Sequence, residues 1–211
     1  MKAITSHFTS TARGFSLMEL LVVVGIMAVL AAVAIPAMTG NNNAANLTSA
    51  AQRLADEMRL AQQTSTTRNL PVEVRFYLLP DPTNTSAKIY RGFQSFLVND
   101  DSTYQPLTKA SFLPTGITTN TSAAYSTLIT EFTPLTSTFS VPTAGTTYQY
   151  VAFQFKSDGS TNLSSAPNAG GSWCVTLEPQ REKEGSTPGL KANFATLQID
   201  PLIGRVKVIR P

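Results

Sequence analysis

The sequence predicts an α+β protein in which one long N-terminal helix packs on an antiparallel β-sheet, and three patterns predict it. An apolar run covers residues 15–35, and an amphipathic helical stripe follows it. From residue 71 onward, short segments alternate apolar and polar residues between turns that contain Gly, Pro and Asp. We therefore divide the chain into a polar leader (1–14), an apolar helix (15–36), an amphipathic continuation of that helix (37–68) and a β-rich domain (69–211).

The first helical element is the apolar run, which reads RGFSLMELLVVVGIMAVLAAVAIP over residues 13–36. As a helix at 1.5 Å per residue, the stretch from Phe15 to Ile35 is about 30 Å long, which matches the hydrocarbon thickness of a bilayer. Lys2 and Arg13 precede this stretch, so the positive-inside rule places the N-terminal end in the cytoplasm. We expect a single transmembrane span in the inner membrane, with everything after Pro36 exported to the periplasm or the exterior.

A single carboxylate, Glu19, stands inside this apolar run. A carboxylate in hydrocarbon costs roughly 2.5–3.5 kcal/mol on insertion scales, so we expect Glu19 to have a function and a partner. Residues 32–34, Ala-Val-Ala, have the small side chains of a secretory cleavage site. A secretory signal gains nothing from a charge in its apolar core, so Glu19 favours a helix that is retained.

The helical pattern resumes after a patch at residues 39–43, TGNNN, which consists of weak helix formers and is a candidate joint. Apolar residues then recur at alternating spacings of four and three, which predicts an amphipathic helix that ends near Thr66. The predicted buried stripe consists of Leu47, Ala51, Leu54, Met58 and Ala61. The predicted solvated side consists of Arg53, Asp56, Glu57 and Arg59.

The β-rich part is predicted from period-2 alternation, and in its first strand Glu73, Arg75 and Tyr77 alternate with the apolar residues that face the core. This pattern predicts a half-buried strand. The middle of the domain, residues 100–145, is rich in Thr, Ser and Pro and predicts irregular strands and long loops. Strands are predicted at residues 72–78, 88–98, 148–156, 173–178, 194–199 and 205–209.

The composition excludes most catalytic chemistry. Cys174 is the only cysteine, so an internal disulfide and a cysteine metal cluster are both excluded. The only histidine, His7, lies in the leader, so a chain without its leader has no histidine for Ser-His, Cys-His or zinc chemistry. We expect no enzyme activity, no cofactor and no metal. Without Lys2 and Arg13 the chain has 14 basic and 13 acidic residues, a balance that disfavours nucleic acid as a partner.

The N-terminal run resembles that of type IV prepilins and type II secretion pseudopilins. The shared signature is Gly14, Phe15, a glutamate four residues later at Glu19, an apolar helix and Pro36 at its far end. The resemblance implies a pilin-like fold, cleavage between Gly14 and Phe15 by a prepilin peptidase, and N-methylation of Phe15. It also implies assembly into a filament through the helix, with Glu19 and Pro36 as assembly residues.

In such filaments the carboxylate corresponding to Glu19 is thought to pair with the N-terminal amine of a neighbouring subunit, which would give the charge in the membrane a partner. The partners that the resemblance implies are other pilin or pseudopilin subunits, the prepilin peptidase and N-methyltransferase, the inner-membrane assembly platform and the lipid bilayer.

The C-terminal third carries a second resemblance, to minor pseudopilins of the H type and to FimT-like minor pilins. The matching features are Phe155 and Gly159 in FQFKSDG, the strand SWCVTLE, and NFATLQID followed by Gly204. The GFSLMELLVV start and the GRVKVIRP end are also similar to a verrucomicrobial group of prepilin-like proteins.

Three basic residues near the C-terminus, Arg205, Lys207 and Arg210, are candidate nucleic-acid contacts. On an extended strand Arg205 and Lys207 share a face about 7 Å apart, a spacing suited to successive phosphates. Some FimT-like pilins are thought to bind DNA through a Gly-Arg-x-Arg motif. Here Lys207 replaces the second arginine and loses its planar bidentate fork. The alternative is a solvated edge strand whose charges protect it from pairing.

These features together indicate a structural function, as a minor subunit of a type IV pilus or of a type II secretion pseudopilus. A chain longer than a compact major pilin and a loop-rich middle favour the minor role. Two alternatives remain open: a DNA-binding minor pilin that serves DNA uptake, and a membrane-anchored β domain that never polymerises.

Overall fold

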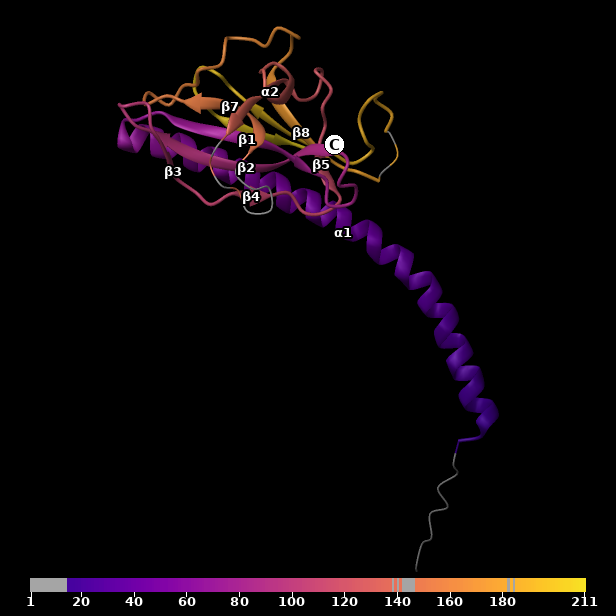
Figure 1. Cartoon of the computed structure of the whole chain (residues 1–211). Helices are drawn as coiled ribbons and strands as arrows, with labels where there is room; N and C mark the ends of the chain where they lie inside the picture. The colour runs from indigo at the N-terminus through magenta and orange to yellow at the C-terminus, as the bar shows by residue number, and fades with distance from the viewer. Residues whose placement is uncertain (1–14, 138, 140, 142–146, 182, 184) are drawn as a thin grey trace, which may run out of the picture. The chain divides into compact units, whose positions relative to one another are not determined.

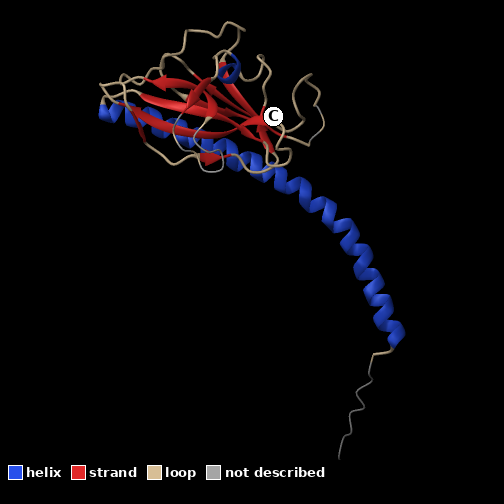
Figure 2. Ribbon diagram, viewed as in Figure 1, coloured by secondary structure: helices blue, strands red, loops and turns tan. Residues whose placement is uncertain are grey.

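The computed structural model describes residues 15–137, 139, 141, 147–181, 183 and 185–211, without the side chains of residues 32–42. It confirms the α+β class, with a long helix and antiparallel strands (Figure 1; Figure 2). The elements in chain order are α1 (Leu17–Arg68), β1 (Val72–Pro80), β2 (Lys88–Val98), β3 (Tyr104–Pro106), β4 (Ser111–Phe112), β5 (Ile117–Thr119), α2 (Thr127–Thr130), β6 (Leu135–Ser137), β7 (Tyr148–Phe155), β8 (Trp173–Pro179), β9 (Ala195–Ile199) and β10 (Val206–Ile209).

The chain forms two compact units, Met1–Asn41 and Asn42–Pro211. Helix α1 belongs to both, because its backbone is helical without interruption through the 39–43 patch. The boundary between the units nevertheless falls at Asn41, inside that patch of weak helix formers.

In the second unit, the predicted stripe of α1 is buried, and every one of its five residues is at most 1% exposed. Ala50 and Ala55 widen this face, and their small side chains allow the helix to approach the strands closely. Figure 1 shows this part of α1 lying along the strands. This part of α1 therefore has one buried face and one exposed face.

The strands form two antiparallel sheets, whereas the sequence predicted one. The six-stranded sheet has the order β3-β2-β1-β7-β6, with β4 also paired to β2. The four-stranded sheet has the order β10-β9-β8-β5. The inner faces of both sheets and the buried face of α1 share one core, which includes Leu54 from the helix, Val74 from the first sheet and Val175 from the second.

The predicted strands all exist, with ends that differ by one or two residues. The middle of the domain is more regular than the sequence indicated, because β3, β4, β5, α2 and β6 all lie between residues 100 and 145. The last two predicted strands pair as β9 and β10, with Lys207 opposite Gln198. The second sheet was missed because β5, a three-residue strand far away in the sequence, completes it by pairing with β8.

Strand β1 is buried on both faces, so its predicted half-buried character was wrong. Val72, Val74 and Phe76 face the main core, while the alternate residues face a second cluster on the other side of the sheet. That second cluster contains Tyr77, Phe96, Tyr148 and Tyr150, and partly buried Phe139 packs against it. Residues remote in sequence supply this cover, which local alternation cannot reveal.

A buried ion pair lies in this second cluster. Arg75 Nε donates to Glu73 Oε1 at 2.6 Å, and the two side chains are 2% and 8% exposed. The Arg75 guanidinium carbon lies 4.2 Å from the ring centre of Phe96 and 4.5 Å from those of Tyr104 and Tyr150. The aromatic faces therefore replace much of the hydration that the cation loses on burial.

Polar bonds link this cluster to the helix. Tyr77 donates its hydroxyl to Gln94 Oε1 at 2.6 Å, and burial raises the pKa of Tyr77, which keeps the phenol a donor. Gln94 donates to the carbonyl of Thr108, and Thr108 Oγ1 donates to Glu57 Oε1 at 2.5 Å. Glu57 was assigned to a purely solvated face of α1, and that assignment was wrong.

The buried pair predicts an asymmetric response to mutation. Arg75→Met should lower the free energy of unfolding by about 3–5 kcal/mol, because it leaves the Glu73 carboxylate buried without its cation. The double variant Arg75→Met with Glu73→Gln should recover part of that loss. Denaturant unfolding of the full chain in mild detergent, followed through the single tryptophan, Trp173, measures both.

The matched control is Arg59→Met, which removes an arginine from the exposed ion pair with Asp56 on α1. Exposed pairs contribute about 0–1 kcal/mol, so this variant should unfold almost as the parent does. Equal destabilisation by Arg75→Met and Arg59→Met would contradict the structural role of the buried pair.

Candidate functional site

The first turn of α1 is closed by a reciprocal pair of hydrogen bonds between Ser16 and Glu19. The backbone N–H of Glu19 donates to Ser16 Oγ at 3.2 Å, and the backbone N–H of Ser16 donates to Glu19 Oε2 at 3.1 Å. The Ser16 hydroxyl also donates to Oε2 at 3.3 Å. Leu20 N–H donates to the Ser16 carbonyl, so Ser16 is the N-cap and Glu19 the third helical residue of a capping box.

The capping box gives Glu19 a partner within its own chain. A carboxylate in the first turn is also stabilised by the partial positive charge at the helix N-terminus. Both bonds from Ser16 end on Oε2, and among the described residues nothing bonds to Oε1. Ser16 was not among the residues predicted from the sequence, although Ser-x-x-Glu before an apolar run is the sequence signature of this motif.

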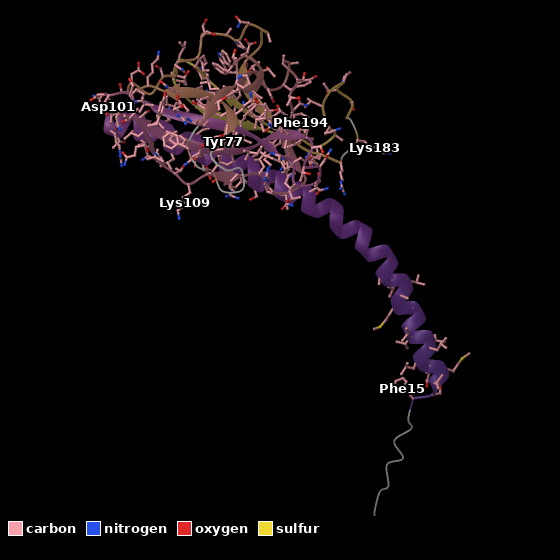
Figure 3. The ribbon with its side chains drawn as sticks, in the orientation of Figure 1. Phe15, Tyr77, Asp101, Lys109, Lys183 and Phe194 are labelled. Atoms are coloured by element: carbon pink, nitrogen blue, oxygen red, sulfur yellow. The ribbon has the colours of Figure 1, made fainter. Side chains whose placement is uncertain are left out.

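The side chains that follow are apolar and exposed on every side of the helix. From Phe15, which is 81% exposed, to residue 31, every side chain is exposed. Figure 3 shows Phe15 beside the first turn of α1. A helix that is apolar on all sides is normally surrounded by protein or lipid. Because these side chains are exposed, the first unit itself does not provide such surroundings.

Parts of the predicted N-terminal site lie outside the described residues. These parts are Gly14 and the side chain of Pro36, so the cleavage site and the end of the apolar helix stay predictions. N-methylation of Phe15 and the assembly role of Glu19 also stay predictions. In the part of the chain that the structure describes, no helix is long and apolar enough to cross a membrane.

The three C-terminal basic residues do not form one group. Arg205 is exposed immediately before β10 and Lys207 is exposed within it, and neither side chain bonds to a described residue. Arg210 instead donates from Nη1 to Thr48 Oγ1 on α1 and from Nη2 to Asn193 Oδ1 at 3.1 Å. Arg210 therefore fastens the C-terminus to the helix, which leaves Arg205 and Lys207 as the unpaired cations of this predicted group.

The glycines of the second resemblance meet at one residue of α1. Gln62 Nε2 donates to the carbonyl of Gly159 at 3.2 Å and to that of Ile203 at 2.7 Å. Gly204 has a φ of +66°, and a Cβ built there would lie 2.2 Å from Gly159 O and 2.6 Å from Gln62 Nε2. The β9–β10 turn can thus approach the helix only with glycine at this position. Gln62 was not among the residues predicted from the sequence.

The tryptophan and cysteine of β8 are core residues. Trp173 is 4% exposed, stacks with Phe132 and donates its indole N–H to the carbonyl of Ser164 at 2.8 Å. Cys174 is 8% exposed and lies against Thr127 Oγ1. Their contacts account for them as packing residues.

Comparison with known proteins gives one family match, at the N-terminus, and several matches to solved structures. Residues 9–35 match the family described as the prokaryotic N-terminal methylation motif. No curated protein matches the sequence. Among solved structures, the chain is similar to the minor pseudopilin EpsH from the Type 2 Secretion System of Vibrio cholerae, with 9% identity, a TM-score of 0.42 and coverage of 79% of this chain and 98% of that one. It is also similar to the type IV minor pilin FimU of Pseudomonas aeruginosa, with 13% identity, a TM-score of 0.44 and coverage of 82% and 96%.

The close approach at Gly204 is testable against a second glycine. Gly204→Ala should lower the free energy of unfolding by about 1–3 kcal/mol, because the new Cβ adds a collision with Gly159 O to the strain of a positive φ. Gly170→Ala is the control, since Gly170 has a φ of +79° but a Cβ added there would have no heavy atom within 4 Å. Denaturant midpoints compare the two, and equal losses would show that the contact with Gly159 has no role.

Proposed function

We propose that this chain, which carries the prokaryotic N-terminal methylation motif of type IV prepilins and pseudopilins, is a minor pilin or pseudopilin that assembles through its N-terminal helix. The observation that carries the proposal is the exposed, apolar helix surface of residues 20–31, which directly follows the Glu19 carboxylate held in the first turn. Such a surface is stable in lipid before assembly and among the helices of other subunits after it.

Processing supplies the charge that Glu19 needs. Cleavage between Gly14 and Phe15 by a prepilin peptidase creates an amine one residue ahead of the Ser16 cap, and methylation of that amine leaves it cationic. In the assembled state, the amine of a neighbouring subunit approaches the free Oε1 of Glu19, while Oε2 stays bonded to Ser16. The carboxylate then has a partner on each oxygen, which offsets its cost in a water-poor helix bundle.

The remainder of the chain supports a structural role. The second unit has a continuous core that joins the helix to two sheets. Two unpaired cations at Arg205 and Lys207 are few for a duplex-binding surface, which contacts several phosphates. No observation favours the DNA-binding alternative, and the membrane-anchored domain that never polymerises becomes an outcome of the tests below.

Processing is tested by the mass of the mature chain. Protein extracted from membranes of cells that express a prepilin peptidase should begin at Phe15 and be one methyl group heavier than the unmodified mature sequence. Intact mass spectrometry with N-terminal sequencing measures this, and Gly14→Ile, which puts a bulky residue at the cut site, should retain the leader. A chain that begins near Ile35, or one that keeps residues 1–14, would contradict the proposal.

Assembly is tested at Glu19. Glu19→Gln keeps the size of the side chain but removes its charge, so cleavage and membrane insertion should persist while incorporation into filaments falls about tenfold or more. Quantitative immunoblotting of sheared filaments against membrane fractions measures this. Incorporation equal to that of the parent would show that Glu19 does not pair with another subunit.

Ser16 variants separate the cap from the charge. Ser16→Ala keeps the Glu19 carboxylate but removes the cap at a cost of about 1 kcal/mol, so incorporation should fall by roughly fivefold, less than in Glu19→Gln. Ser16→Thr retains a hydroxyl and should behave like the parent. A loss in Ser16→Thr as large as in Ser16→Ala would show that the hydroxyl is not what matters.

A further inference from the structure

A polar groove of about 450 Å³ lies beside the C-terminal strand, on the side of the second sheet that faces away from the core. Lys207 of β10 lies opposite Gln198 of β9, and Gln198 lies opposite Cys174 of β8, so the side chains of this row share one face. Arg205 stands two residues before Lys207 and borders the same groove. The residues of the groove that matter here are Ser172, Gln198, Asp200, Leu202, Arg205 and Lys207.

The groove has more hydrogen-bond donors without a partner than acceptors without one. Gln198 Nε2 already donates to Ser172 Oγ at 2.8 Å, and Asp200 Oδ1 accepts the backbone N–H groups of Leu202 and Ile203. Arg205 makes no ion pair with Asp200, and neither Arg205 nor Lys207 has a side-chain partner among the described residues. The groove thus presents two free cations beside one carboxylate that is engaged in its own turn.

The backbone of β10 is also unused on one side. It is the terminal strand of the order β10-β9-β8-β5, and its only pairing in the described chain is with β9. Its outer N–H and C=O groups are therefore available to an added strand. Leu202 at the adjoining turn is 74% exposed and provides an apolar contact at the rim of the groove.

We propose that the edge of β10 and this groove bind an acidic, extended peptide segment of another protein. Alternate side chains of an extended chain are about 7 Å apart. Arg205 and Lys207 are two positions apart, Arg205 immediately before β10 and Lys207 within it. Two carboxylates at alternate positions therefore meet the two cations while the peptide backbone pairs with β10. An apolar side chain at the end of the segment packs on Leu202.

The same features disfavour nucleic acid as the occupant. A nucleic-acid backbone forms no ladder with a strand edge, and it has no apolar side chain for Leu202. Stable non-specific binding of a duplex relies on many phosphate contacts, whereas this groove offers two cations. The proposal is independent of filament assembly, since it concerns only residues of the second unit.

The test uses the full chain in detergent micelles and a fluorescein-labelled peptide of alternating Glu and Val. Fluorescence anisotropy should show binding that weakens with salt and that weakens about tenfold in the double variant Arg205→Ala with Lys207→Ala. The control, Lys88→Ala with Lys109→Ala, also removes two exposed cations and should bind the peptide as the parent does. Figure 3 shows Lys109 pointing away from the strands.

Hydrogen exchange measured by mass spectrometry examines the backbone part of the proposal. The amides of residues 206–209 should exchange more slowly with the peptide present. A matched peptide with Gln in place of Glu should neither slow this exchange nor show a rise in fluorescence anisotropy. Binding of both peptides alike, or no loss in the Arg205 and Lys207 double variant, would overturn the proposal. Tighter binding of a duplex oligonucleotide that the double variant abolishes would replace the peptide with nucleic acid.

Discussion

The packing of residues 42–68 of α1 on the inner faces of two separate sheets is the contact on which the rest of the second unit depends. The sheets share no strand, and one core that includes the helix joins them. Side chains of the same helix also form hydrogen bonds to four distant segments. Glu57 bonds to Thr108, Gln62 bonds to the turns at Gly159 and Ile203, and Thr48 bonds to the C-terminal Arg210. Each of these bonds involves a side chain of a helix whose position is already fixed by its buried apolar face. The loops that it holds therefore need to bury little apolar surface of their own.

The helix and most strands were predictable because their signals are local. Leu47, Leu54 and Met58 repeat at helical spacing, and the alternation of β1 and β9 is visible within single segments. The second cluster was not predictable, because the residues that cover Arg75 come from positions near 96, 104, 139 and 150. Period-2 alternation indicates that the two faces of a strand differ. It does not indicate that aromatic rings will cover the face that carries the charged residues.

At the N-terminal site, the prediction from the sequence was incomplete for a different reason. Glu19 was recognised from its unusual position in an apolar run, and the family resemblance placed its partner on another subunit. The structure adds a nearer partner in Ser16, and a local motif in the sequence contained that information. The amine proposed as the second partner would not compete with Ser16, since the bonds from Ser16 occupy Oε2 and leave Oε1 free. A carboxylate that is fixed in direction by its own helix loses less side-chain entropy when a cation of another chain approaches it.

The C-terminal strand illustrates how a sequence motif divides into separate physical roles. In Gly204-Arg205-Val206-Lys207, the glycine permits the turn to touch Gln62, and the valine enters the core. Only Arg205 and Lys207 of this motif are left without a partner among the described residues, and Arg210, which looked equivalent in sequence, serves the fold. Since the buried face of α1 and the inner faces of both sheets are committed to one core, recognition by this unit has to use its edges and turns. The outer edge of β10, with Lys207 on the strand and Arg205 just before it, is where such recognition requires no rearrangement of the core.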